Sequence, residues 1–224
     1  MSLDFLPQYL GLLLEAAMLT AALAVLSFAI GAVCGLGIAV LRLLGGSDVN
    51  AVLGLMVDLI RGTPLLVQML GWYLGTAVLG FGLSPFVAAI VALSVNAAAF
   101  LSEVIRGGVR ALPKGQREAA LAIGLSRTYS IVRIELPQAL PAIIPAVLGF
   151  FIGLVKDTSL AYVLGLYELT RTGKIIADRE FRPLEIYLVI AAIYFVLCFA
   201  LSRLVVVVDR RAQAGGLVQE HLSK

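Results

Sequence analysis

The chain has 224 residues, of which 61% are hydrophobic and only 14% are charged. Soluble domains usually carry about 45–50% apolar and about 25% charged residues, so this chain has too little polar surface to be solvated as a compact particle. The composition excludes a disordered chain, a disulfide scaffold and an ordinary water-soluble enzyme, and it predicts a multi-span helical membrane protein. The net charge of +3 is weak evidence for nucleic-acid binding, because basic residues also set membrane topology.

Five apolar segments follow one another along the chain, at residues 10–41, 52–79, 84–105, 139–155 and 186–208. About 20 residues cross the hydrocarbon core as a helix, so we predict an all-α, polytopic membrane protein with about five transmembrane helices. The excess length of the first segment predicts an interfacial lead-in at residues 1–19, before a transmembrane domain at 20–209 and a cytoplasmic tail at 210–224. No cleaved signal peptide is expected, because the N-terminus has no basic region.

The basic side chains indicate how these helices are oriented. Cytoplasmic loops of membrane proteins carry an excess of Lys and Arg. If the N-terminus lies outside, ten basic residues fall on the inner side, at Arg42, in the loop between the third and fourth segments and in the C-terminal tail, whereas five fall on the outer side between residues 156 and 182. We therefore predict an N-out, C-in topology.

The loop at about residues 106–136 is too polar to cross lipid and shows two helical patterns. The first pattern, at residues 114–123, follows Pro113. It is expected to end at Gly124, because glycine tolerates the left-handed conformation that stops a helix.

The second short helix of this loop is predicted at residues 127–135. Ser126 can cap its N-terminus, and Pro137 is expected to break it, because proline has no backbone N–H to donate. Both short helices are therefore expected to meet water or another protein.

The spacing of residues in this loop matches a known pattern. Glu118-Ala119-Ala120 is followed by Gly124 and, further on, by Ile134 and Leu136-Pro137. At each of these spaced positions the loop resembles the EAA loop of ABC importer permeases. Other strings resemble the polar amino-acid permeases of that family: Ile60 to Gln68, Asn96 to Glu103, Arg106-Gly107-Gly108, Gly115-Gln116, Leu136 to Ala139 and Lys156 to Leu160. Together the matches cover about residues 15–210.

The resemblance implies the fold of a type I ABC importer permease and the role of transmembrane subunit for polar amino acids such as histidine, glutamine, glutamate or arginine. Such a permease lies in the bacterial cytoplasmic (inner) membrane and pairs with a second permease chain, the same or paralogous. It rests on two ABC ATPase subunits and receives its substrate from an extracytoplasmic amino-acid-binding protein, and no nucleic acid is expected as a partner.

The resemblance also implies where ATP is hydrolysed. ATP and Mg are expected in the partner ATPase, so this chain is expected to bind no cofactor or metal and to hold no catalytic residue. Its sequence has no Gly-x-x-x-x-Gly-Lys-Ser/Thr phosphate loop.

The same resemblance makes residues 114–124 the coupling helix, which docks in a groove of the ATPase. The expected coupling residues are Gly115, Gln116, Glu118, Ala119, Ala120 and Gly124. Ala119, Ala120 and Ile123 are expected on one side of the helix, where small side chains allow close approach to a groove. Glu118 suits the positive end of a helix. A solvated loop helix with an ordinary glycine stop is the alternative.

The chain departs from the family at two positions of the fourth span. Pro141 stands where an arginine is common, and Gly149 stands where an asparagine is common. Any role of those polar side chains in selecting substrate is not expected to carry over to this chain.

Charges at membrane depth cost at least about 2.5–3.5 kcal/mol, so each one is a candidate for function. Glu103 lies seven residues after Asn96, which is two helical turns on one face. A carboxylate and an amide facing one cavity could bind a zwitterionic amino acid, with Glu103 taking the ammonium group. The alternative is a local ion pair of Glu103 with Arg106.

Two further polar strings lie within apolar segments. Lys156-Asp157-Thr158-Ser159 interrupts an otherwise apolar stretch from Ile143 to Leu166, and it is expected either to line the substrate path or to form an ion pair that holds the span end. In the second segment, Asp58 and Arg61 are expected to form a local ion pair, with a gate contact as the alternative. Thr63-Pro64 follows this pair and is expected to disturb the helix at that point.

Three other functions fit the sequence less well than an amino-acid importer. An ion-driven secondary transporter is expected to show internal repeats, and this chain shows none. A permease of the same coupling class for another small solute fits the second- and fourth-span strings less well. A membrane scaffold without transport would have no need of paired polar groups in its spans.

Overall fold

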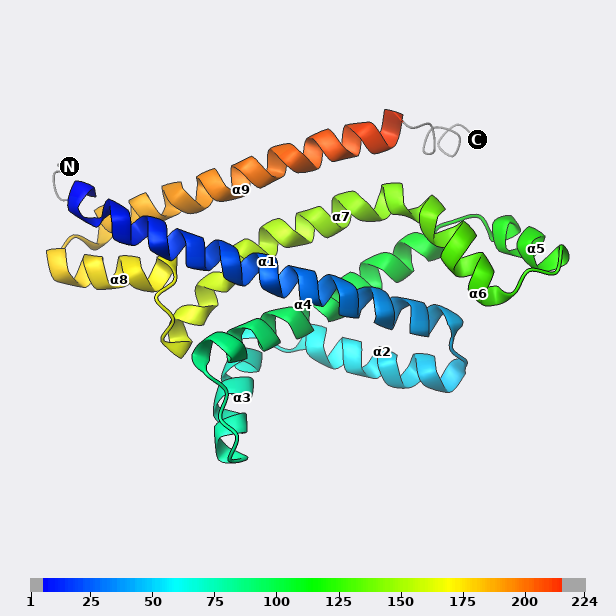
Figure 1. The fold of residues 1–224 in the computed structure, drawn as a ribbon, viewed down its shortest axis with the longest axis horizontal. Coiled ribbons are helices and arrows are strands. Elements are labelled where there is room, and N and C mark those ends of the chain that lie inside the picture. Colours follow the sequence, from blue (N-terminus) through cyan, green and yellow to red (C-terminus); the bar gives the residue numbers. More distant parts are fainter. Residues whose placement is uncertain (1–5, 215–224) are drawn as a thin grey trace. The chain divides into compact units, whose positions relative to one another are not determined.

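The computed structural model describes residues 6–214. Residues 1–5 and 215–224, which belong to the predicted lead-in and the predicted tail, lie outside the described residues. Residues 6–214 are mostly helical and contain no strand, so the all-α prediction is confirmed (Figure 1). The elements are α1 (Leu6–Leu44), α2 (Ser47–Gly62), α3 (Leu65–Val78), α4 (Pro85–Arg110), α5 (Lys114–Ala122), α6 (Arg127–Tyr129), a π-helix (Ser130–Glu135), α7 (Leu136–Asp157), a 3₁₀-helix (Thr158–Leu164), α8 (Leu169–Glu180) and α9 (Pro183–Ala214).

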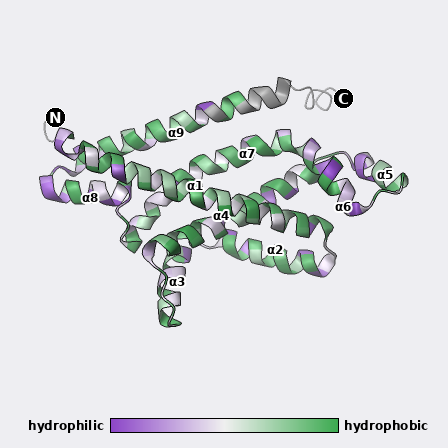
Figure 2. Ribbon diagram, viewed as in Figure 1, coloured by the Kyte–Doolittle hydropathy of each residue, from purple (hydrophilic) through white to green (hydrophobic). Residues whose placement is uncertain are grey.

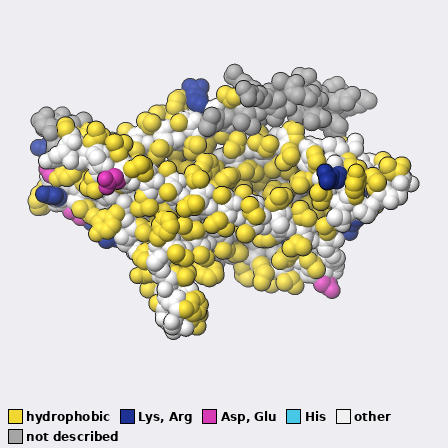
Figure 3. All heavy atoms as spheres, viewed as in Figure 1, with side chains coloured by type: hydrophobic (Ala, Val, Ile, Leu, Met, Phe, Trp, Pro, Cys, Tyr) yellow, Lys and Arg dark blue, Asp and Glu magenta, His cyan; other side chains and the backbone are white. Residues whose placement is uncertain are grey.

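Among residues 6–214, four helical stretches are long and apolar enough to cross a membrane: α1, α4, Arg127–Leu164 and Pro183–Val207. A fifth span results if α2 and α3, which are bent by 103° at the break between them, count as one. Hydrophobic residues dominate these helices in Figure 2, whereas hydrophilic residues stand out on α5, α6 and α8. The face drawn in Figure 3 is mostly hydrophobic and carries few charged side chains, as a surface in contact with lipid should.

The break between α2 and α3 lies at Thr63 and Pro64. Pro64 has extended backbone angles, φ −61° and ψ 134°, and precedes the first residue of α3. Proline disfavours helical angles in the residue before it and donates no backbone hydrogen bond, so the helix stops there and restarts. The prediction that this dipeptide disturbs the second segment is confirmed.

Helix α1 runs without interruption past Thr20 to Leu44. The structure therefore places residues 6–19, predicted as a lead-in, in the same helix as the first span. Glu15 is exposed on this helix, whereas Thr20 is fully buried.

The chain forms two compact units. The first comprises the described residues up to 29 together with residues 63–95 and 151–201. Its core joins the start of α1 to α8 and α9 through Tyr9, Leu13, Ala16, Leu169, Ile176, Ala177, Ile186 and Ile190. The backbone N–H of Leu169 donates to the hydroxyl of Thr20 at 3.1 Å. Gly173 lies against Ile190, and any side chain at this position would overlap it. Helix α8 is therefore packed closely against its neighbours.

The second unit comprises residues 30–62, 96–150 and 202–214 as far as the structure describes them. Its core consists of Ala39, Leu43, Ile105, Val109, Ile131, Ala139 and Ile143. A Cβ atom at Gly35 would lie 2.9 Å from the carbonyl oxygen of Ala98, so α1 and α4 approach backbone to backbone. Lipid tails are as apolar as these side chains, so the hydrophobic effect gives little attraction between helices in a membrane. Close packing of small residues holds such helices together instead.

The prediction that Pro137 breaks the second short helix is wrong. Residues Arg127–Leu164 form one helical stretch that passes through Pro137. The π-helix ends at Glu135, two residues before the proline, and the N–H of Leu136 donates to the carbonyl of Ile131. A proline ring clashes with the carbonyl four residues earlier in a regular α-helix. The wider π turn moves that carbonyl away and lets the helix continue.

Candidate functional site

The short helix predicted at residues 114–124, for which a coupling role is expected, is present as α5, Lys114–Ala122. Gly124 has φ +83°, the left-handed conformation predicted for it. The N–H of Gly124 donates to the carbonyl of Leu121 at 3.0 Å, and that of Leu125 donates to Ala120 at 3.1 Å. These two bonds form a Schellman motif, which satisfies carbonyls that the helix end leaves free. The next helix starts as predicted, because the hydroxyl of Ser126 accepts from the N–H of Tyr129 at 3.2 Å.

The exposed face of α5 differs from the predicted one. Ala119 and Ile123 are exposed, but Ala120 is 3% exposed and turns into the chain. The expectation that all three share a docking face is therefore wrong for Ala120, because α5 packs on the π-helix. Glu118 and Leu121 are exposed beside Ile123, which is 77% exposed.

An ion pair fixes α5 to the long helix that follows. The Nη2 atom of Arg117 lies 2.5 Å from Oε2 of Glu135, and its Nε atom lies 3.0 Å from the same oxygen. The Glu135 side chain is only 2% exposed, and it also accepts a bond from the hydroxyl of Ser130 at 2.9 Å. These hydrogen bonds to Glu135 raise the pKa of the Arg117 guanidinium. A buried carboxylate needs such donors to offset its desolvation.

The sequence patterns did not reveal this pair. Glu135 lies 18 residues after Arg117 and on a different helix, so the i,i+3 and i,i+4 spacings that predict local ion pairs do not apply. The available signal was that Glu135 is the one acid of the second helical pattern at residues 127–135. Among the other coupling residues, Gln116 accepts a long bond from Gln138 at 3.4 Å, and Gly115 is exposed.

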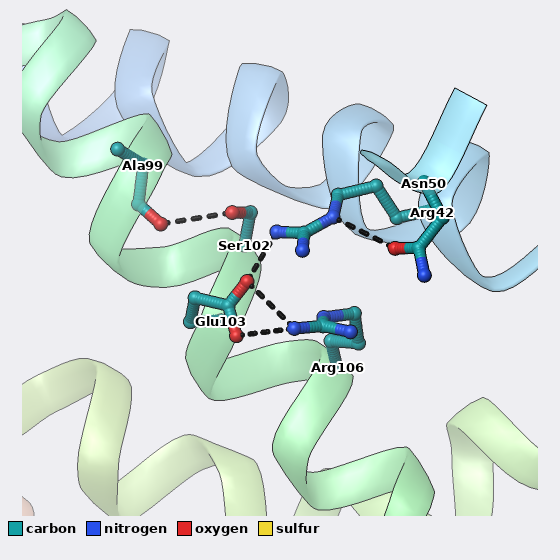
Figure 4. A network of polar contacts seen from close by, with 6 residues as sticks. All are labelled: Arg42, Asn50, Ala99, Ser102, Glu103 and Arg106. Carbon is teal, nitrogen blue, oxygen red and sulfur yellow. Dashed lines mark hydrogen bonds and ion pairs between the residues drawn. The ribbon is translucent and has the colours of Figure 1, made fainter. Parts of the chain in front are cut away.

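Glu103 lies in a network of charges at the end of α4 (Figure 4). Its carboxylate binds Nη2 of Arg106 at 2.8 and 3.0 Å, which is the local ion pair named as the alternative. It also binds the guanidinium of Arg42 on α1, whose side chain is 5% exposed. The Nε atom of Arg42 donates to Asn50 at 3.3 Å. Two arginines therefore already neutralise Glu103. Asn96, which lies two turns earlier on α4, is buried.

Arg42 was missing from the predicted site. Its sequence separation from Glu103 is 61 residues, so the pair is visible only in the fold. Arg42 is the only basic residue of the first 60, and an isolated charge near a span end is a signal of this kind.

The string Lys156-Asp157-Thr158-Ser159 stands where α7 ends and tightens into the 3₁₀-helix. The hydroxyl of Thr158 is buried and donates to the carbonyl of Val155 at 2.7 Å. Within residues 6–214 no ion pair joins Lys156 to Asp157, so the ion-pair interpretation gains no support. Lys156 and Ser159 instead line a pocket of about 290 Å³, together with Thr170 of α8 and Tyr187 and Tyr194 of α9.

A buried glutamate is hydrogen-bonded to two of the residues that line this pocket. Glu168 is 0% exposed and caps α8, accepting from the N–H groups of Thr170 at 2.9 Å and Arg171 at 2.8 Å. The hydroxyl of Tyr194 also donates to it at 3.2 Å. Burial raises the pKa of Glu168, against the opposing effect of these hydrogen bonds. Glu is not a preferred cap residue, so capping rules did not identify it.

The predicted pair of Asp58 and Arg61 is not formed. In the part of the chain that the structure describes, no ion pair joins them. The guanidinium carbon of Arg61 lies 5.0 Å from the ring centre of Phe100, so a cation–π contact replaces the expected pair. Thr63 accepts bonds from the side chain of Gln68, at 3.0 Å to both its carbonyl and its hydroxyl.

Comparison with known proteins adds what the geometry alone leaves open. Residues 30–214 match the family described as binding-protein-dependent transport system inner membrane component. This chain belongs to that family. It is similar to the glutamine transport system permease protein GlnP of Escherichia coli strain K12, with 40% identity over 202 residues that cover 89% of this chain and 92% of that protein. It is also similar to the L-cystine transport system permease protein TcyB of Bacillus subtilis strain 168, with 38% identity over 193 residues, or 86% of this chain and 82% of that protein.

Solved structures agree with this family. A crystal structure of an amino acid ABC transporter with histidines has a chain that is 36% identical, with a TM-score of 0.86 over 94% of this chain and 100% of that chain. A chain of the methionine transporter MetNI matches with a TM-score of 0.76 at 23% identity and supports the fold alone. The chain is thus a multi-pass inner-membrane protein with the predicted fold of an ABC importer permease.

Proposed function

We propose that this chain is the transmembrane subunit of an ATP-driven importer for a polar amino acid. Three named relatives support the substrate class: permeases for glutamine, for L-cystine and, from Escherichia coli O6:H1, for glutamate and aspartate. The family description supports delivery of the substrate by a separate binding protein. In the proposed topology the N-terminus is outside, so α8 faces the binding protein and α5 faces the cytoplasm.

The observation that carries the proposal is the construction of α5. This helix exposes Glu118, Leu121 and Ile123, ends at a Schellman motif, and is tied by Arg117 to Glu135. A docking helix needs exposed apolar side chains for its partner and a rigid connection to the spans, and α5 has both. We assign α5 to the groove of an ATPase subunit.

The assembly implied is two ATPase subunits beneath two permease chains, identical or paralogous. ATP and Mg bind in the ATPase subunits, and this chain contributes no catalytic residue. Closure of the ATPase pair displaces α5, and the displacement opens or closes a cavity for the substrate.

Within the first unit, the pocket lined by Lys156 and Ser159 is the best candidate for part of the substrate path. A lysine ammonium group can bind the carboxylate of an amino acid, and the hydroxyl groups of Thr170 and Tyr194 offer hydrogen bonds. Glu103 is the weaker candidate, because two arginines already bind its carboxylate.

The test is reconstitution of the assembled complex in liposomes. Substrate-loaded binding protein is expected to stimulate ATP hydrolysis and uptake of a polar amino acid. Glu118→Lys is expected to abolish this stimulation while the complex still inserts, because Glu118 is exposed and the change alters only the docking face. Arg133→Glu, an exposed charge reversal on the neighbouring helix, serves as the matched control. Uptake driven by an ion gradient without ATPase subunits would refute the proposal.

A further inference from the structure

A second pocket, of about 150 Å³, lies in the second unit where α1 ends and α2 begins. Four arginines line it, namely Arg42, Arg110, Arg117 and Arg127, together with residues 45–47 of the turn. A single water needs about 10–15 Å³ of such space, so the pocket has room for a polyatomic group.

Among the described residues, the arginines that line this pocket outnumber the carboxylates bound to them. Arg42 shares the carboxylate of Glu103 with Arg106, and Arg117 holds Glu135. The remaining two wall arginines have no carboxylate partner among residues 6–214: Arg127 donates to a carbonyl oxygen and Arg110 makes no ion pair.

The backbone adds to this positive potential. Helix α2 begins at Ser47, and the N–H groups of its first turn carry a partial positive charge. The negative end of α1 is already satisfied there, because Nη2 of Arg127 donates to the carbonyl of Leu43 at 2.8 Å. Arg42 is held in position from two sides, by Asn50 and Glu103, so its guanidinium is ordered before any ligand arrives.

A small pocket lined by arginines suits an anion with several oxygen acceptors, since each guanidinium presents a planar fork of donors. The pocket also lies at the ends of predicted spans, where the phosphates of lipid headgroups are found, and basic pockets between membrane helices bind such headgroups. We propose that this pocket binds a phosphate group, carried either by an anionic membrane phospholipid or by free phosphate.

The test uses the full chain, purified in a neutral detergent and stripped of lipid. Its unfolding midpoint is followed during titration with short-chain phosphatidylglycerol, with inorganic phosphate, and with phosphatidylcholine of the same chain length. A ligand that binds only the folded state raises the midpoint with concentration. Phosphatidylglycerol or inorganic phosphate is expected to raise it and phosphatidylcholine to have little effect. The more effective of the first two probes identifies the source of the phosphate.

Arg110→Gln is the deciding variant, because Arg110 is exposed and makes no ion pair with any residue that the structure describes. It is expected to weaken binding by roughly tenfold, and Arg110→Lys is expected to restore part of the loss. The matched control is Arg133→Gln, an exposed arginine outside the pocket, which is expected to change binding less than about twofold. Equal losses in the two glutamine variants, or no midpoint shift with either phosphate probe, would overturn the proposal.

Discussion

The guanidinium of Arg117 on α5 is bound to the carboxylate of Glu135, the last residue of the π-helix, with 2.5 Å between Nη2 and Oε2. The arginine is 39% exposed and the glutamate 2% exposed, so the contact joins a surface helix to the interior. The π-helix continues into α7, which belongs to a predicted membrane span. A displacement of α5 would therefore be transmitted through this ion pair to that span. This ion pair therefore has two measurable consequences, one for stability and one for coupling.

Arg117→Gln is expected to lower the free energy of unfolding of the chain by about 1–3 kcal/mol, because it leaves the Glu135 carboxylate buried with only the Ser130 hydroxyl as donor. ATP hydrolysis in the assembled complex should also respond less to loaded binding protein. Denaturant unfolding measures the first effect and stimulated ATPase activity the second. Lys114→Gln removes an exposed charge from the same helix and should change neither, so equal effects of the two variants would show that the pair is not the cause.

Gly124→Ala is expected to destabilise the end of α5 by about 1–2 kcal/mol, because its φ of +83° is costly for a residue with a Cβ atom. No atom lies within 4 Å of the Cβ position, so the cost is conformational and not steric. Gly115→Ala is a matched control, since that glycine also has open space but a helical backbone. It should stabilise the helix slightly. Limited proteolysis of the loop measures both, and equal cleavage rates would argue against the Schellman motif as the stop.

Glu103→Gln separates a structural role from a substrate role. If the carboxylate serves to neutralise Arg42 and Arg106, the variant should unfold at lower temperature while the substrate concentration for half-maximal uptake changes less than about twofold. Glu15→Gln, at an exposed position, controls for a general effect of removing an acid from a span. An unchanged melting temperature with a large rise in that substrate concentration would instead restore Glu103 to the substrate path.

The stability of the first unit is expected to depend on pH through Glu168. Burial raises the pKa of this carboxyl above its usual range, although its hydrogen bonds act in the other direction. A carboxyl with a raised pKa in the folded state stabilises the fold at low pH. That contribution is lost as the pH rises from about 4.5 through the folded value.

Glu168→Gln keeps an oxygen acceptor for the cap of α8 and cannot ionise. Its unfolding midpoint should therefore decline less than that of the parent chain as the pH rises above about 4.5. Thermal unfolding at a series of pH values measures this, with Glu15→Gln as the control. Parallel pH profiles for the parent and Glu168→Gln would exclude Glu168 as the titrating group.

The features that could be predicted from the sequence are those whose causes lie within a few residues. Apolar length specified the spans, Thr63-Pro64 broke the second of them, and Gly124 and Ser126 formed the expected stop and cap. The ion pair of Glu103 with Arg106 also follows from helical spacing alone. Apart from the spans, these features depend on groups that lie within about one helical turn of each other, where backbone geometry dictates which groups meet.

The tertiary structure decided which distant side chains became partners. Arg42 reached Glu103 across 61 residues, Arg117 reached Glu135 across 18, and Arg61 turned to Phe100 instead of Asp58. The expectation that Pro137 ends the helix also failed, because the π-helix before it changes the backbone hydrogen-bond pattern. A charge at a helix end can reach several neighbouring helices, and only the packing of those helices determines which carboxylate or ring lies within its reach.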